Sequence, residues 1–143
     1  MSAKALFFSF SAGGRQYAVP LDKVKRVVPL ELIHEAPLLK EFYDGVFKYE
    51  GEIVALLNLA ALHGRPEAGD AVEPLVLLHR IDKQLVGLII DRADKIVEFD
   101  TSSLISIDSG LEGIEKKAVI GDSDFLFFDL DSLTFTESDN NNK

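Results

Sequence analysis

The 143-residue sequence contains no cysteine, so disulfide bridges, thiolate zinc sites and cysteine nucleophiles are excluded. Basic residues are in the minority: 15 Lys and Arg stand against 24 Asp and Glu, which gives a formal net charge of −9. Proteins bind nucleic acid largely by neutralising phosphates with Lys and Arg, and anionic membranes attract the same side chains. The charge balance therefore argues against nucleic acid and anionic membrane surfaces as partners.

Long apolar runs are also missing. No stretch approaches the roughly 20 apolar residues that cross a bilayer, and residues 1–8 lack the long apolar region and cleavage site of a signal peptide. We therefore expect a cytoplasmic protein with no direct membrane insertion. Hydrophobic residues nevertheless make up 47% of the chain, the usual share for a globular protein, so a packed core is expected.

Short apolar or alternating runs separated by turn residues predict an all-β fold. Glycine readily adopts the positive φ of hairpin turns, and Gly13-Gly14 and Gly51 stand at such positions. Gly87 lies inside a predicted strand, where a missing side chain is expected to allow close packing within the sheet. The expected strands lie at residues 7–11, 17–21, 53–57, 75–81, 85–90 and 125–128.

Helical signals are few and short. Asp22 is expected to cap a helix over residues 22–27, because its side chain can accept a hydrogen bond from the first free N–H groups. Asn58 is expected to cap a second helix that stops at Gly64. Residues 37–43 add one or two helical turns.

An internal repeat appears when the chain is compared with itself at a shift of 69 residues. Residues 18–23 then fall on residues 87–92, and at a shift of 71 Asn58 falls on Asp129. Each repeat reads as a strand, a turn, a strand and an Asp expected to cap a helix, which in the second repeat is Asp91. The pattern predicts a duplicated β unit.

The repeat divides the domain at residues 5–136 into two sequence halves, 5–64 and 74–136, which we assign to a first and a second barrel. Loop 64–74 joins them and contains two Gly and two Pro, whereas the polar tail 137–143 is expected to be flexible. Each half is small for independent stability, so the halves are expected to share an interface with a groove. Exchange of strands between the barrels stays open.

No constellation in the sequence indicates catalysis. His34, His63 and His79 show no i, i+4 spacing and are expected to be surface or half-buried side chains. Gly13-Gly14 lacks the Lys and the Ser or Thr of a phosphate loop, and no Gly-x-Ser-x-Gly elbow occurs. We predict a binding module that is not an enzyme and uses no cofactor.

An acidic cluster near the C-terminus raises the question of calcium. Calcium loops need closely spaced oxygen ligands, an internal Gly and a closing Glu. Here a strand-like run at residues 125–128 divides the acids, which suit turns and helix caps instead, so no metal site is predicted. A small acidic ligand-binding, metal-binding or hydrolytic β-barrel stays as an alternative. The cluster consists of Asp122, Asp124, Asp129 and Asp131.

Three motifs, in this order, resemble those of CheW-like domains. Residues 16–28 resemble the opening motif, residues 45–59 the central hairpin, and residues 86–91 the third motif. The resemblance covers residues 5–135 and implies two five-stranded SH3-like β-barrels packed side by side, with a few short helices. It also implies a chemotaxis adaptor that binds the regulatory domain of a CheA-type histidine kinase and the cytoplasmic tip of chemoreceptors. A scaffold in a non-flagellar pathway, for pilus motility or gene regulation, stays open.

The resemblance also implies where partners bind. Val24 matches an apolar position at the kinase or receptor face, and Gly45 and Gly51 match glycines beside the binding groove. Burial of Val24, a turn role for each glycine, and core roles for Phe47 and Tyr49 are the competing interpretations. With two charged residues added, the candidate partner-binding set is Val24, Arg26, Gly45, Phe47, Tyr49, Glu50 and Gly51.

Two charges in this set are opposite in sign to the family pattern. Glu50 stands where the family usually has Arg, and Arg26 stands where it often has Glu. We hypothesise that the two side chains form an ion pair across the first barrel, with the signs exchanged. Charge complementarity mainly sets specificity and association rate, so the exchange points to a dedicated set of partners.

Overall fold

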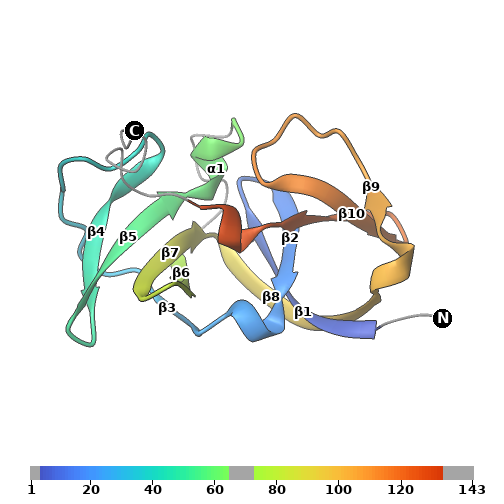
Figure 1. Cartoon of the computed structure of the whole chain (residues 1–143), viewed down its shortest axis with the longest axis horizontal. Helices are drawn as coiled ribbons and strands as arrows, with labels where there is room; N and C mark the ends of the chain where they lie inside the picture. Colours follow the sequence, from blue (N-terminus) through green and yellow to red (C-terminus); the bar gives the residue numbers. More distant parts are fainter. Residues whose placement is uncertain (1–3, 65–72, 134–143) are drawn as a thin grey trace.

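Strands make up most of the computed structural model, which describes residues 4–64 and 73–133 (Figure 1). The all-β prediction is therefore confirmed. The helical turns are α1 (Leu59–Leu62) and three 3-10 turns, η1 (Leu21–Lys23), η2 (Thr101–Ser103) and η3 (Leu130–Ser132). The strands are β1 (Lys4–Ala12), β2 (Arg15–Pro20), β3 (Arg26–Pro29), β4 (Tyr43–Tyr49), β5 (Glu52–Asn58), β6 (Leu75–Ile81), β7 (Gln84–Ile90), β8 (Arg92–Asp100), β9 (Ile105–Ser106), β10 (Ile114–Ile120) and β11 (Ser123–Phe128).

The strands form two sheets, each curled into a small SH3-like barrel. The six-stranded barrel has the order β8-β1-β2-β11-β10-β9, and the five-stranded barrel has the order β3-β6-β7-β5-β4. Strands β2 and β11 are parallel, as are β5 and β7, and the other neighbours are antiparallel. Figure 1 shows the five-stranded barrel on the left and the six-stranded barrel on the right.

Each barrel takes strands from both halves of the sequence. Strands β1 and β2 lie in the six-stranded barrel with β8 to β11, whereas β6 and β7 lie in the five-stranded barrel with β3 to β5. The halves 5–64 and 74–136 therefore do not form one barrel each. The two parallel pairs are the reason, because β2 pairs with β11 and β7 with β5, so each hairpin completes the barrel of the other half.

The strand pairing repeats at the same shifts as the sequence. Phe7 pairs with Val97 in one barrel, and Val76 pairs with Val28 in the other, so both partners are offset by 69 residues. The isolated bridge between His34 and Val46 likewise corresponds, 71 residues on, to the pairing of Ile105 with Lys117. The two barrels therefore share one strand order, and the duplicated β unit predicted from the sequence is present in three dimensions.

Apolar side chains fill each barrel and the junction between the barrels. Gly87 shows how tightly the five-stranded barrel packs, since an added Cβ would lie 2.5 Å from Val76 Cγ1. The interiors are built on Phe7, Ala18, Phe99, Ala118 and Phe125 in the six-stranded barrel and on Phe47, Val54, Leu56, Val76, Leu78 and Leu85 in the five-stranded barrel. The junction core takes residues from both barrels: Phe10, Ala12, Tyr17, Val19, Leu57, Leu59, Leu77, Leu88, Ile90, Ile114, Phe128 and Leu130.

One of the predicted helix caps is present and two are wrong. Asn58 accepts a hydrogen bond from Ala61 N at 3.0 Å and begins α1. Asp22 lies inside η1 and caps nothing, because the chain continues into β3, which pairs with β6. Asp91 instead accepts from Gly13 N at 2.9 Å and so ties the β1–β2 turn to the end of β7. Residues 37–43 form turns without a helix.

Two predicted segments fall largely outside the described residues. They are the loop 64–74, of which residues 65–72 lie outside, and the whole of the tail 137–143. Within the two described ranges, no helix is long and apolar enough to cross a bilayer.

Candidate partner-binding site

Three of the seven predicted residues meet at one end of the five-stranded barrel. Arg26, Tyr49 and Glu50 lie on the rim of a groove of about 400 Å³, which we call the charged groove. Its floor is apolar, because Leu78 and Leu85 are 1% and 3% exposed. The full lining is Lys25, Arg26, Tyr49, Glu50, Glu52, Leu78, Arg80 and Leu85.

The β4–β5 turn sets the position of the rim. Glu50 and Gly51 have φ values of 50° and 85°, so both central residues adopt the positive φ of a two-residue hairpin turn. A Cβ added to Gly51 would meet no atom within 4 Å, so the glycine serves the backbone conformation rather than close packing. The turn keeps Tyr49 and Glu50 at the end of the barrel, facing β3.

The hypothesised contact between Arg26 and Glu50 is present. Arg26 Nη1 lies 4.0 Å from Glu50 Oε2, and the two side chains are 63% and 73% exposed. The same Nη1 donates a hydrogen bond to the Tyr49 hydroxyl at 2.9 Å. An exposed ion pair contributes only about 0–1 kcal/mol to stability. These contacts therefore define the charge pattern of the rim more than they stabilise the fold.

A second ion pair crosses the charged groove and was not predicted from the sequence. Arg80 donates to both carboxylate oxygens of Glu52, at 3.0 and 3.1 Å, and also to the Lys83 carbonyl at 3.2 Å. The hydrogen bond from Arg80 lowers the pKa of the Glu52 carboxyl below its ordinary value. The sequence carries no spacing signal for this pair, because strand β7 separates β5 from β6 in the sheet.

The other predicted residues have structural positions. Phe47 is 3% exposed and belongs to the interior of the five-stranded barrel. Gly45 is buried at a bulge in β4, where an added Cβ would overlap the His34 carbonyl oxygen. Val24 is half-buried and packs against the junction core. None of these three lines the charged groove.

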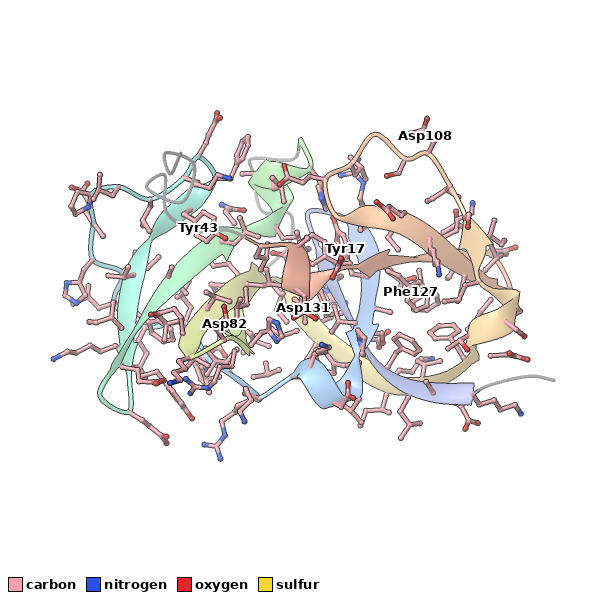
Figure 2. All side chains as sticks on the ribbon, in the orientation of Figure 1. Tyr17, Tyr43, Asp82, Asp108, Phe127 and Asp131 are labelled. Atoms are coloured by element: carbon pink, nitrogen blue, oxygen red, sulfur yellow. The ribbon has the colours of Figure 1, made fainter. Side chains whose placement is uncertain are left out.

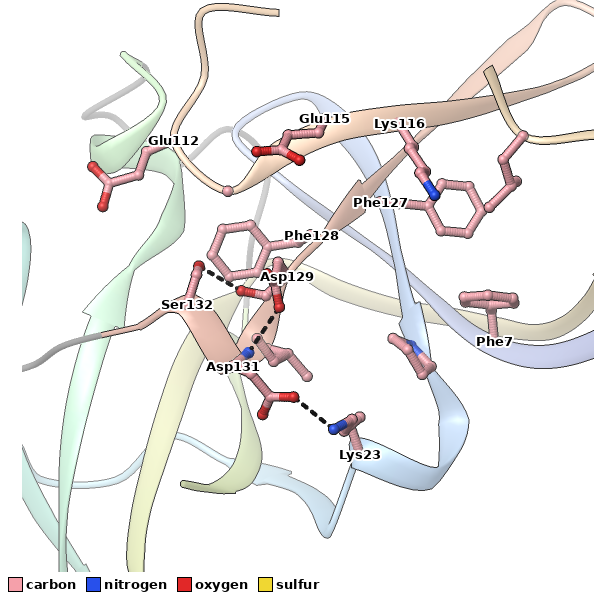
Figure 3. Close-up of a pocket in the computed structure, with 14 residues that line it drawn as sticks. Phe7, Lys23, Glu112, Glu115, Lys116, Phe127, Phe128, Asp129, Asp131 and Ser132 are labelled. Carbon is pink, nitrogen blue, oxygen red and sulfur yellow. Dashed lines mark hydrogen bonds and ion pairs between the residues drawn. The ribbon is translucent and has the colours of Figure 1, made fainter. Parts of the chain in front are cut away.

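A second hollow, of about 380 Å³, lies between the six-stranded barrel and the turns η1 and η3 (Figure 3). Phe7, Phe127 and Phe128 form its apolar wall, and Lys23 and Asp131 form an ion pair at its edge with 2.6 Å between Nζ and Oδ2. Sequence analysis missed it, since these residues come from distant segments that only the exchange of strands brings together.

Two of the histidines are more buried than expected. His63 and His79 are each 3% exposed, so the expectation of surface or half-buried histidines is wrong for both. The His63 Nε2–H donates to the Glu112 carbonyl at 2.8 Å, and its Nδ1 accepts from the Tyr17 hydroxyl at 2.8 Å. Burial lowers the pKa of His63, which fits a neutral ring. Hydrogen-bond partners on both nitrogens explain how the ring is tolerated inside the junction.

The acidic cluster serves turns and ion pairs. Asp129 accepts from the Asp131 backbone N–H at 3.1 Å and caps η3, and Asp124 pairs with Lys117 at 3.1 Å. Across residues 4–64 and 73–133, no group of three His, Asp or Glu residues could hold a metal ion.

A family model described as a CheW-like domain matches residues 6–135. The chain belongs to the CheW-like family. A curated relative, the chemotaxis protein CheW of Treponema pallidum (strain Nichols), is 23% identical over 117 residues, which are 79% of this chain and 69% of the relative. The crystal structure of the scaffolding protein TtCheW from Thermoanaerobacter tengcongensis superposes with a TM-score of 0.81 and 21% identity, and covers 90% of this chain and 86% of that one.

Proposed function

We propose that this CheW-like chain is a chemotaxis adaptor whose charged groove binds the regulatory domain of a CheA-type histidine kinase. The observation that carries the proposal is the groove itself, in which Arg26–Glu50 and Arg80–Glu52 flank the apolar floor of Leu78 and Leu85. Protein interfaces commonly combine a desolvated apolar centre with a polar rim. Family membership and the named relatives support the same role.

The adaptor role requires a second partner, which we propose is the cytoplasmic tip of a chemoreceptor. It would bind a surface distinct from the charged groove, so that one chain holds receptor and kinase together in the cytoplasm. In this proposal the chain works by binding alone, without a cofactor and without catalysing a reaction. The rim charges decide which kinase is accepted, because complementary charges act mainly on specificity and association rate.

A nuclear magnetic resonance titration of the labelled chain tests the proposal. The probes are the unlabelled regulatory domains of the CheA-type kinases from the same genome. We expect binding with a dissociation constant on the order of micromolar, with the largest shift changes at the amides of Arg26, Glu50 and Arg80. Binding to none of these domains, or shift changes confined to the six-stranded barrel, would contradict it.

Matched charge variants sharpen this test. Glu52→Lys breaks the Arg80 pair inside the groove and should weaken binding about tenfold. Asp124→Lys breaks a comparably exposed Lys117 pair on the six-stranded barrel and should leave binding unchanged. Binding only to a kinase of a pilus or gene-regulatory pathway would assign the chain to that pathway instead of flagellar chemotaxis.

A further inference from the structure

The ring of His79 joins the two barrels through both of its nitrogens. His79 lies on β6 of the five-stranded barrel, and its side chain is 4% exposed. Nδ1 lies 2.9 Å from the carbonyl oxygen of Lys23, in η1, and Nε2 lies 3.0 Å from Oδ1 of Asp131, in η3. Turns η1 and η3 follow β2 and β11, the parallel pair of the six-stranded barrel. Asp131 lies near the middle of the molecule, between the barrels (Figure 2).

Both oxygens that face the His79 ring are acceptors. A backbone carbonyl and an ionised carboxylate can only accept, and a neutral imidazole carries a single N–H. A neutral ring would therefore satisfy one contact and turn a lone pair toward the other oxygen. Asp131 is held ionised, because the hydrogen bond from Lys23 and, secondarily, that from His79 lower the pKa of its carboxyl. Only the imidazolium donates to both oxygens.

We propose that protonated His79 is a pH-responsive clamp between the two barrels, complete when both ring nitrogens donate and weakened when the ring loses a proton. The clamp consists of His79, Lys23 and Asp131. It is independent of the proposed adaptor function, because it concerns how the barrels are held together and not what they bind.

The charges around the clamp favour this assignment. Lys23 and Asp131 form an ion pair, so the carboxylate is shared between an ammonium and the imidazolium. Asp22 and Asp129 also act on Lys23 and offset the second positive charge. On the neighbouring strand β3, Lys25 and Arg26 flank the segment through backbone pairing with Leu78, and Val86 of β7, opposite His79, is apolar.

The internal repeat shows that the fold can close the junction without this clamp. The position equivalent to His79, at a shift of 69, is Phe10, which stacks on Tyr17 with 5.5 Å between ring centroids. The position equivalent to Asp131, at a shift of 71, is Ala60. One copy of the repeat therefore packs with apolar groups where the other uses three polar ones, so the clamp adds a pH response that packing alone does not need.

The sign of the pH response follows from the contacts. Protonation of His79 adds a charge-assisted hydrogen bond in the folded state, so its stabilisation is present toward acidic pH and is lost as the pH rises. It is lost again in strong acid, when Asp131 takes up a proton. Because the pKa of Asp131 is lowered, this acid limit lies below the ordinary range of a carboxyl.

Urea unfolding of the whole chain and of Asp131→Asn at pH 6 and pH 8 tests the clamp. We expect the loss in unfolding midpoint caused by Asp131→Asn to be about twice as large at pH 6 as at pH 8, since charge-assisted hydrogen bonds are roughly twice as strong as neutral ones. Asp124→Asn is the matched control, because Asp124 and Asp131 are both 52% exposed and each pairs with a lysine, but only Asp131 meets a histidine. Its effect should be the same at both pH values.

Ring resonances of the unmodified protein provide a second readout that does not depend on a variant folding. At pH 6 we expect two protected imidazole N–H protons on His79, one on each nitrogen. A single N–H at pH 6, or an Asp131→Asn effect that changes with pH no more than that of Asp124→Asn, would overturn the proposal.

Discussion

Two tyrosines show how the surroundings of a single hydroxyl group change its energetic effect. The Tyr17 hydroxyl donates to His63, whereas the Tyr43 hydroxyl is buried without a hydrogen-bond partner in the described part of the chain. Burial, with a smaller effect of the Glu112 charge, raises the pKa of Tyr43. A buried polar group without a partner loses its hydration and gains nothing in return.

The two Tyr→Phe variants should therefore differ in sign. Tyr43→Phe should leave the free energy of unfolding unchanged or raise it by up to about 1 kcal/mol, because it removes an unpartnered hydroxyl. Tyr17→Phe should lower it by about 1–3 kcal/mol, because it leaves His63 Nδ1 without a donor. Urea denaturation measures both, and a cost for Tyr43→Phe equal to that for Tyr17→Phe would contradict this account.

His63 makes the opposite contribution to pH dependence from that proposed for His79. Burial lowers the pKa of His63 from its ordinary value of 6.5, and the hydrogen bond to Glu112 only partly opposes this. Its stabilisation is therefore complete above that value and is lost as the pH falls. In His63→Gln, an amide that does not titrate can replace both contacts, so its stability should fall less than that of the unmodified protein between pH 7.5 and pH 5. Parallel stability curves would show that His63 is not responsible.

At the scale of elements, turns were easier to predict than helices. The Glu50-Gly51 turn follows from local backbone preference, which a sequence displays directly. The helix predicted over residues 22–27 competes with tertiary pairing, and Arg26–Pro29 pairs with β6 instead. Local capping signals alone could not reveal that competition, because the partner strand begins at Leu75.

The one predicted cap that is present can be tested directly. Asn58→Ala should lower the free energy of unfolding by about 1 kcal/mol, because Ala61 N loses its acceptor at the start of α1. Asn58→Ser keeps a capping oxygen and should recover most of that loss, although the exposed hydrogen bond to Asp44 is absent in both variants. Thermal or urea unfolding compares them, and equal losses would mean that the cap contributes nothing.

At the scale of the whole molecule, the exchange of strands explains which parts of the site could be predicted. Arg26 and Glu50 belong to the same sequence half and barrel, and their contact was anticipated from the two reversed charges. Glu52 and Arg80 come from different halves, and only the placement of β6 in the five-stranded barrel brings them together. The duplicated unit was visible in the sequence, but its long-range pairing was not, because pairing depends on packing between distant segments.

The most direct test of the central claim is titration calorimetry of the kinase regulatory domain with the charge-exchange series at Arg26 and Glu50. The account predicts that Glu50→Arg weakens binding about tenfold and that adding Arg26→Glu restores most of the loss, because the rim then carries the same pair with the signs exchanged. Unchanged affinity for Glu50→Arg, or no recovery in the double variant, would contradict the role of this groove in binding the kinase.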